Sequence, residues 1–170
     1  HRGVIPRHLR PMIGDYLFGC DICQDVCPWN RKASYTDDPA FATRPAYHAL
    51  SPRDVLGLTG RQFNRLFEGS PIRRTRRAGL ARNAAIVLGN RADPADIPWL
   101  ASRLCVDPDP VVRVHIAWAL GQIDAPDVLA SLERARASDP DEAVREEATL
   151  CLEEHPRHGA ETPLYMNLMR

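Results

Sequence analysis

Apolar residues recur with the period of an α-helix through the second half of the chain, and the pattern repeats. From residue 71 onward, alanine, leucine and valine recur at helical spacing, and Asp-Pro pairs mark the turns. The segments LARNAAIVLGN (80–90), VRVHIAWALGQ (112–122) and VREEATLCLEE (144–154) align at intervals of 32 residues. This register superimposes the following apolar positions: Leu88, Leu120 and Leu152, and likewise Ala84, Ile116 and Ala148. Paired helices with a fixed period predict an α-solenoid.

Shorter helices are expected between these segments, at residues 94–105 and 126–137. Each is opened by an Asp next to a Pro, which helix starts favour. Three repeats are about the minimum that buries a continuous core. A hydrophobic helix ending in Leu-Gly, followed by Asp-Pro and a second helix, resembles short HEAT-like repeats, although the period is shorter than typical. Such repeats are equally typical of a simple scaffold, so they do not define a function by themselves.

The stretch before the repeats predicts a linker and two short helices. Residues 31–50 contain two prolines and no clear period, which indicates a linker. In the next helix Ser51 is the expected N-cap, with Pro52 at the first helical position and Asp54 in the first turn. The second helix carries apolar residues along one face: Phe63, Leu66 and Phe67.

The chain is therefore expected to be mainly α, with a ferredoxin-like cysteine segment followed by a HEAT-like solenoid. The expected divisions are residues 1–33 (cysteine segment), 34–70 (linker and short helices), 71–155 (repeats) and 156–170 (tail). The chain begins at His1 without an initiator methionine, so we expect it to be truncated.

Three cysteines lie close together in GCDICQDVCPWN (19–30). Their spacing, Cys20-x2-Cys23-x3-Cys27-Pro, matches the last three cysteines of the bacterial ferredoxin run, whose thiolates hold 4Fe-4S clusters. Zinc is an alternative, because Cys-x2-Cys is also half of a zinc site and His8 or His48 offers a further ligand. A disulfide framework is less favoured, because the cysteines are clustered and odd in number. Cys105 and Cys151 are expected to be buried core residues of helices.

The charge is polarised along a chain whose formal net charge is +0. Residues 61–82 hold seven arginines and only Glu68 as an acid, whereas residues 121–154 hold ten acids and three arginines. Guanidinium groups bind phosphate bidentately, so the arginine run predicts a nucleic-acid surface; a merely solvated charge run is the alternative. Helical spacing predicts that Arg73 and Arg77 project from one side, and the acidic end is expected to face away from the RNA.

Together, IPRHLRPMIGDYLFGCDICQDVCPWN (5–30), FEGSPIRRTRRAGLARNAAIVLGN (67–90) and the repeats closely resemble the C-terminal part of the epoxyqueuosine reductase family. The resemblance implies a cobalamin-dependent oxidoreductase with two 4Fe-4S clusters, which reduces epoxyqueuosine to queuosine at the tRNA wobble position. It further implies that Cys20 and Cys23 ligate one cluster and that Cys27 completes the other. The remaining cysteines, the corrinoid domain and the catalytic acid would lie before His1, so this chain alone is expected to be inactive.

Further site residues are expected on two grounds. The arginine run supplies the expected tRNA-binding residues, Arg73, Arg74, Arg76, Arg77 and Arg82. The resemblance implies that His1, Arg2 and Asp21 belong to the cofactor or substrate pocket, and a solvated loop is the alternative for each. Trp29 is expected either to shield the cluster or to pack as an anchor for the linker. The expected partners are tRNA and an unidentified electron donor.

Two other classes remain open at this point: a corrinoid iron-sulfur protein related to reductive dehalogenases, and a zinc-binding HEAT-like interaction module. No apolar run approaches the roughly 20 residues of a membrane span, and nothing at the N-terminus resembles a signal peptide. The chain is thus expected to be a cytoplasmic monomer.

Overall fold

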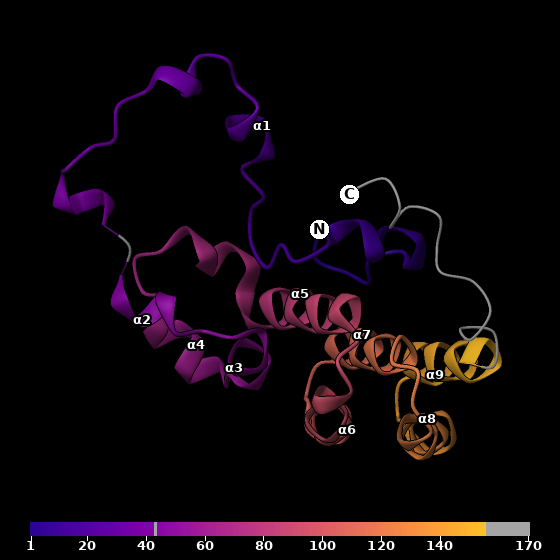
Figure 1. The fold of residues 1–170 in the computed structure, drawn as a ribbon. Coiled ribbons are helices and arrows are strands. Elements are labelled where there is room, and N and C mark those ends of the chain that lie inside the picture. The colour runs from indigo at the N-terminus through magenta and orange to yellow at the C-terminus, as the bar shows by residue number, and fades with distance from the viewer. Residues whose placement is uncertain (43, 156–170) are drawn as a thin grey trace.

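The computed structural model describes residues 1–42 and 44–155, and within them the fold is helical without any β-strand (Figure 1). The α-helices are α1 (Ile22–Asp25), α2 (Pro45–His48), α3 (Pro52–Gly57), α4 (Gly60–Leu66), α5 (Arg76–Arg91), α6 (Ile97–Val106), α7 (Pro110–Gly121), α8 (Asp127–Ser138) and α9 (Glu142–Glu154). The 3-10 helices are η1 (Arg7–Leu9), η2 (Pro11–Ile13), η3 (Asn30–Lys32), η4 (Pro39–Phe41), η5 (Pro71–Thr75) and η6 (Pro94–Asp96). The tail at 156–170 lies outside the described residues.

The predicted repeats form two helical layers, which confirms the α-solenoid. Helices α5, α7 and α9 lie side by side, and α6 and α8 pack on one side of this row (Figure 1). Residues 1–17 lie on the other side, where the indigo segment runs above the row in Figure 1. The row of α5, α7 and α9 therefore lies between the α6–α8 layer and the N-terminal segment.

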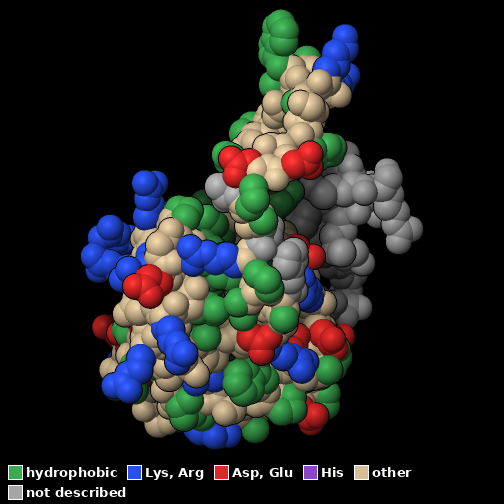
Figure 2. Space-filling model, turned by 90° about the vertical axis from the view of Figure 1, so that its left-hand side faces the viewer, with side chains coloured by type: hydrophobic (Ala, Val, Ile, Leu, Met, Phe, Trp, Pro, Cys, Tyr) green, Lys and Arg blue, Asp and Glu red, His purple; other side chains and the backbone are tan. Residues whose placement is uncertain are grey.

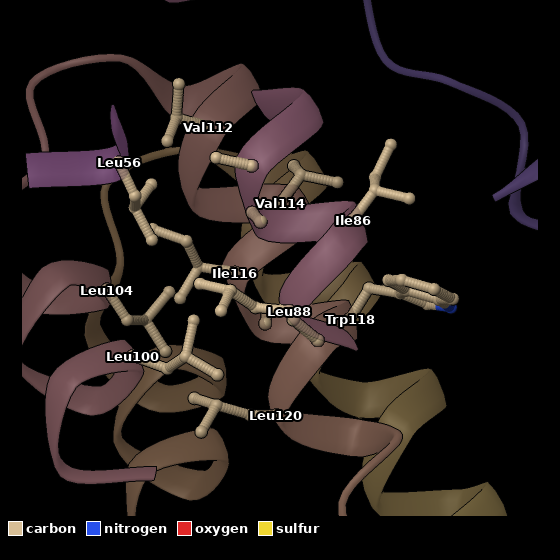
Figure 3. Packing of buried hydrophobic residues seen from close by; sticks show 14 of the residues in the cluster. Leu56, Ile86, Leu88, Leu100, Leu104, Val112, Val114, Ile116, Trp118 and Leu120 are labelled. Atoms are coloured by element: carbon tan, nitrogen blue, oxygen red, sulfur yellow. The ribbon is translucent and has the colours of Figure 1, made fainter. Parts of the chain in front are cut away.

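The 32-residue register marks the core. Ala84, Ile116 and Ala148 are each 0% exposed. Figure 3 shows Ile116 and Leu120 of α7 converging with Leu88 of α5, next to Leu100 of α6. This burial of aliphatic side chains is the main term that stabilises the solenoid.

The Leu-Gly pairs allow neighbouring repeats to approach closely. A Cβ atom on Gly89 would lie 2.7 Å from Cζ3 of Trp118 and 2.8 Å from Cα of Ala119. One repeat later, a Cβ atom on Gly121 would lie 2.6 Å from Sγ of Cys151. All three distances are shorter than real Cβ contacts, so these positions require glycine for steric reasons.

The two short helices before the repeats begin as predicted. Ser51 caps α3 in a capping box with Asp54, and Thr59 caps α4 in a second capping box with Gln62. Phe63 of α4 is buried and lies 5.1 Å, centroid to centroid, from the ring of Phe67. Helix α3 packs against α5, so this pair of helices extends the solenoid at its N-terminal end.

Buried ion pairs link the turns of successive repeats. Asp107 accepts hydrogen bonds from both terminal nitrogens of Arg77, and Asp139, 32 residues later, accepts from Arg113 at 2.8 and 2.9 Å. Asp107 also accepts from the Arg103 side chain at 2.8 Å. Because the two carboxylates occupy equivalent turns, the pairs fix the spacing between repeats as the apolar core does.

One cysteine prediction is wrong. Cys151 is buried in the core as expected, but Cys105 is exposed on α6. Cys105 follows Leu104, which takes the inward position of this helical turn. The apolar sequence around Cys105 therefore did not reveal that its own side chain points away from the core.

Candidate iron-sulfur segment and basic surface

The cysteine segment forms an open loop that leaves the solenoid after Leu17 (Figure 1). Gly19 and Asp21 flank Cys20 and have positive φ angles of 71° and 48°. These left-handed residues turn the chain sharply before the single turn of α1. The backbone oxygen of Asp21 then accepts from the amides of Gln24 and Asp25 at 2.7 and 2.9 Å. The local fold is thus a short turn that presents thiols outward.

Cys20 and Cys23 are exposed and Cys27 is half-buried. Three thiols on a loop of this kind suit the thiolate ligation of iron-sulfur clusters. Among the described residues, no three His, Cys, Asp or Glu side chains are grouped closely enough to hold a metal ion. The three cysteines therefore do not form a closed metal site within the described chain, and their role as cluster ligands stays a prediction.

Apolar side chains around the cysteines face solvent. Trp29 is 88% exposed, so within the described chain it neither covers the thiols nor anchors the linker by packing. The expectation that Trp29 packs as an anchor is therefore wrong, whereas shielding of a bound cluster stays a prediction. Other large side chains in the same loop are also exposed: Tyr16, Phe18, Ile22 and Val26. The loop does not bury its own apolar residues.

The segment before the cysteines is held on the solenoid by a column of polar residues. Asn83 of α5 donates to the Leu17 carbonyl at 3.0 Å, and His115 of α7 accepts from the Ile5 amide at 3.1 Å. Glu147 of α9 accepts from both Arg7 and Arg10. These three solenoid residues are 32 positions apart, so each repeat contributes one polar side chain at the same register.

The sequence analysis missed this column, although its signal was present. Only apolar positions were aligned in the 32-residue register, whereas Asn83, His115 and Glu147 are the polar residues that the same register superimposes. A second set lies two turns along the helices: Asn90 donates to the carbonyls of Arg10 and Gly14, and Glu154 pairs with Arg7. Buried polar groups need partners, and here the N-terminal segment provides them.

The expected pocket residues lie at the start of this segment or in the loop. His1 and Arg2 are exposed, and a ring nitrogen of His1 lies 2.9 Å from the Val4 carbonyl. Asp21 accepts from the Gln24 side chain at 3.3 Å. The structure does not bring the three residues into one pocket within the described chain, and their role in binding stays a prediction.

His115 makes the stability of the contact between the N-terminal segment and the solenoid depend on pH. Burial lowers the pKa of His115 to about 3, and the charges of Arg10 and Arg82 act in the same direction, against the hydrogen bond to Val111. The unfolded chain binds a proton near pH 6.5 whereas the folded chain does not, so His115 reduces stability as pH falls from about 6.5 towards 3, by about 1.4 kcal/mol per pH unit.

We therefore expect the free energy of unfolding of His115→Gln to decrease less steeply between pH 6 and 4.5 than that of the wild type. Urea denaturation across this range measures both slopes. The two slopes should differ by about one proton. Equal slopes would show that His115 is protonated in the folded chain and would contradict the neutral, buried imidazole.

The arginine run is not one continuous helix, contrary to expectation. Arg73 and Arg74 lie in η5, whereas Arg76 has a φ angle of 59° and begins α5. The change of direction removes the helical register between Arg73 and Arg77. The Pro71 ring and the Ser70 cap start η5 as a separate turn.

The five arginines expected to bind tRNA divide into two groups. Arg73, Arg74 and Arg76 are exposed, and within the described chain their guanidinium groups have no hydrogen-bonding or ionic partner. Arg77 instead binds Asp107 and the Leu58 carbonyl. Arg82 is 5% exposed and donates to the carbonyls of His1 and Gly3 at 3.1 and 2.9 Å. Arg77 and Arg82 thus hold the fold together, whereas the side chains of Arg73, Arg74 and Arg76 face solvent.

Family models match both parts of the chain. Residues 72–153 match a model described as HEAT repeats, and residues 1–30 match a model of a 4Fe-4S double cluster binding domain. The fold and the cysteine segment thus define a class: a HEAT-repeat protein with part of an iron-sulfur domain packed on its solenoid. Among the described residues, the helices are all too short or too polar to cross a membrane.

Within this class, the chain is a homologue of the epoxyqueuosine reductases. It is 38% identical over 122 residues to epoxyqueuosine reductase of Xanthomonas campestris pv. campestris. The aligned region covers 72% of this chain and 34% of that protein. It is 38% identical over 121 residues to that of Escherichia coli strain K12, covering 71% of this chain and 31% of that protein. The chain spans about a third of the length of these curated relatives.

Solved structures agree with this relationship. A crystal structure of epoxyqueuosine reductase with a tRNA-Tyr epoxyqueuosine-modified tRNA stem loop has a TM-score of 0.85 and 29% identity, covering 92% of this chain and 42% of that chain. Epoxyqueuosine reductase of Bacillus subtilis has a TM-score of 0.83 and 30% identity, covering 90% of this chain and 41% of that chain. The arrangement of the N-terminal segment on the solenoid is therefore shared with proteins of this family.

Proposed function

We propose that the chain acts as part of an epoxyqueuosine reductase, an oxidoreductase that forms queuosine at the tRNA wobble position. The observation that carries the proposal is that the cysteine segment and the repeats, joined in one chain, match these reductases over about 71% of its length. The catalytic groups are proposed to lie in parts of the protein outside this chain. The proposed place of action is the cytoplasm, with an electron donor whose identity is open.

Cys20, Cys23 and Cys27 are the proposed ligands of two 4Fe-4S clusters shared with cysteines outside this chain. Two observations support this: residues 1–30 match a double cluster model, and the three thiols are accessible but form only part of a donor set. When bound, the clusters supply electron transfer to cobalamin, which we propose is held mainly outside this chain. The chain's own contribution is to fix Cys20 at a defined point, since Asn83 holds the carbonyl of Leu17 three residues earlier.

The solenoid is proposed to dock tRNA through Arg73, Arg74 and Arg76. All three are exposed at the junction of η5 and α5, and their guanidinium groups have no partner in the described chain. Exposed guanidinium groups of this kind bind the phosphate backbone, which positions an RNA without reading its sequence. A match to a structure that contains a tRNA stem loop supports this assignment.

A chimeric enzyme tests the proposed function. This chain replaces the matching segment of the Escherichia coli reductase, in a strain that lacks the native enzyme, and queuosine and epoxyqueuosine are measured in total tRNA. We expect the chimera to restore queuosine and its Cys20→Ser variant to accumulate epoxyqueuosine. Cys105→Ser is the matched control, because Cys105 is also exposed but lies outside the cluster segment.

The outcomes separate the possible classes. A folded chimera that binds zinc instead of iron, or that retains activity without Cys20, would contradict the assignment of cluster ligands. A chimera that binds iron but forms no queuosine would contradict the proposed substrate and leave another iron-sulfur reductase as the explanation.

A further inference from the structure

The exposed basic residues continue beyond the arginines at η5 and α5. Arg61 and Arg65 on α4 are both exposed, and within residues 1–42 and 44–155 neither guanidinium group has a hydrogen-bonding or ionic partner. This contrasts with arginines elsewhere in the chain, such as Arg10, Arg77 and Arg113, which form ion pairs with Glu147, Asp107 and Asp139. The fold therefore leaves the α4 arginines free for another partner.

The geometry of α4 directs these two side chains outward. The Thr59 capping box fixes the start of the helix, and Phe63 on the opposite face is 2% exposed. Arg61 and Arg65 are four residues apart, so their side chains lie next to each other on the outer face, one turn apart. Both arginines are thus held on a helix that the core anchors, rather than on a free loop.

A short turn connects this face to the arginines of η5. Helix α4 ends at Leu66, and Gly69, with a φ angle of 70°, allows the turn that leads to the Ser70 cap of η5. Only four residues separate the two helices, so Arg65 and Arg73 belong to adjoining elements. Figure 2, which looks at this end of the molecule, shows Lys and Arg side chains spread over the surface.

Electrostatics favours a polyanionic partner for this surface. Like charges at positions i and i+4 destabilise a helix by about 0.2–0.5 kcal/mol, and between residues 61 and 76 Glu68 is the one acid among five exposed arginines. Nucleic acids present a continuous row of phosphates, which relieves this repulsion along the whole surface. Counterion release then adds to the binding free energy.

We propose that Arg61 and Arg65 extend the RNA-binding surface from η5 onto α4 and contact the sugar-phosphate backbone of the tRNA. This inference rests on the proposed function, because it takes the RNA bound at Arg73, Arg74 and Arg76 as the partner. The two α4 arginines contribute affinity and orientation but no base specificity.

Binding of the 170-residue chain to a fluorescent tRNA-Tyr anticodon stem loop tests this proposal, measured by anisotropy at several salt concentrations. We expect Arg61→Ala/Arg65→Ala to weaken binding roughly 3- to 10-fold and to reduce the slope of log K against log salt by about one to two units. The loss should be the same for stem loops of different sequence. Arg136→Ala is the matched control, because Arg136 is an exposed, unpartnered arginine on α8.

A second variant distinguishes failure of this inference from failure of the proposed function. If Arg73→Ala/Arg74→Ala/Arg76→Ala reduces affinity and salt slope while Arg61→Ala/Arg65→Ala changes neither, tRNA docking stands and its extension onto α4 is wrong. If neither variant differs from Arg136→Ala, the docking role itself is wrong. Circular dichroism of each variant establishes that the helices are retained.

Discussion

Glu147→Ala is expected to lower the free energy of unfolding by about 3–5 kcal/mol, one of the largest effects of any single substitution in this chain. Glu147 is 6% exposed and accepts from Arg10 at 2.9 and 3.0 Å. Arg10 is itself 1% exposed, with its guanidinium group 5.5 Å from the ring centroid of Trp118. Removing the carboxylate leaves a buried cation without its counter-charge, which costs far more than the hydrogen bonds alone.

The measurement is urea denaturation followed by Trp fluorescence and circular dichroism. Glu153→Ala is the control, because Glu153 lies on the same helix but is exposed, and its effect should stay within about 0.5 kcal/mol. Similar midpoints for the two variants would show that Arg10 does not depend on Glu147, and the ion pair would then have no part in holding the N-terminal segment.

Gly89→Ala is expected to destabilise the chain by about 3 kcal/mol, although alanine favours a helix by about 1 kcal/mol over glycine. The new methyl group would lie 2.8 Å from Cα of Ala119, a backbone atom that cannot move aside without shifting α7. The strain acts at the contact between the first two repeats, so it should lower the midpoint of the whole solenoid.

Gly79→Ala on the same helix provides the comparison. Its new Cβ would meet only Cβ of Thr75, at an ordinary distance of 3.6 Å, so this variant should gain about 0.5–1 kcal/mol from helix propensity. Two identical substitutions on α5 are thus expected to have opposite signs. A stabilised Gly89→Ala would mean that α5 and α7 are not packed as closely as the structure shows.

The repeats could be predicted from sequence because one periodic pattern encodes both the helices and their buried face. Ala84, Ile116 and Ala148 share one position of the 32-residue register, and all three are buried. The N-cap at Ser51 could also be predicted from sequence, because a capping box depends on residues within one helical turn. Local sequence patterns of this kind predict the local structure directly.

Contacts between distant segments could not be predicted in the same way. Arg77 and Arg82 look like any other members of an arginine run, and only the fold places Asp107 and the carbonyl of His1 beside them. The separate turn at η5 was also missed, because a charge run masks the change of direction at Arg76. A basic stretch therefore has to be divided by burial and pairing before any of its residues is assigned to a ligand.

The close contacts at Gly89 and Gly121 also have a consequence for the face of α9 at the equivalent position. The next position in the 32-residue register is Glu153, an exposed carboxylate where the first two repeats have glycine. A further helix cannot approach α9 there as α7 approaches α5 and α9 approaches α7. The face of α9 therefore presents a carboxylate where the first two repeats present glycine, which disfavours equally close stacking of another copy of the repeats against it.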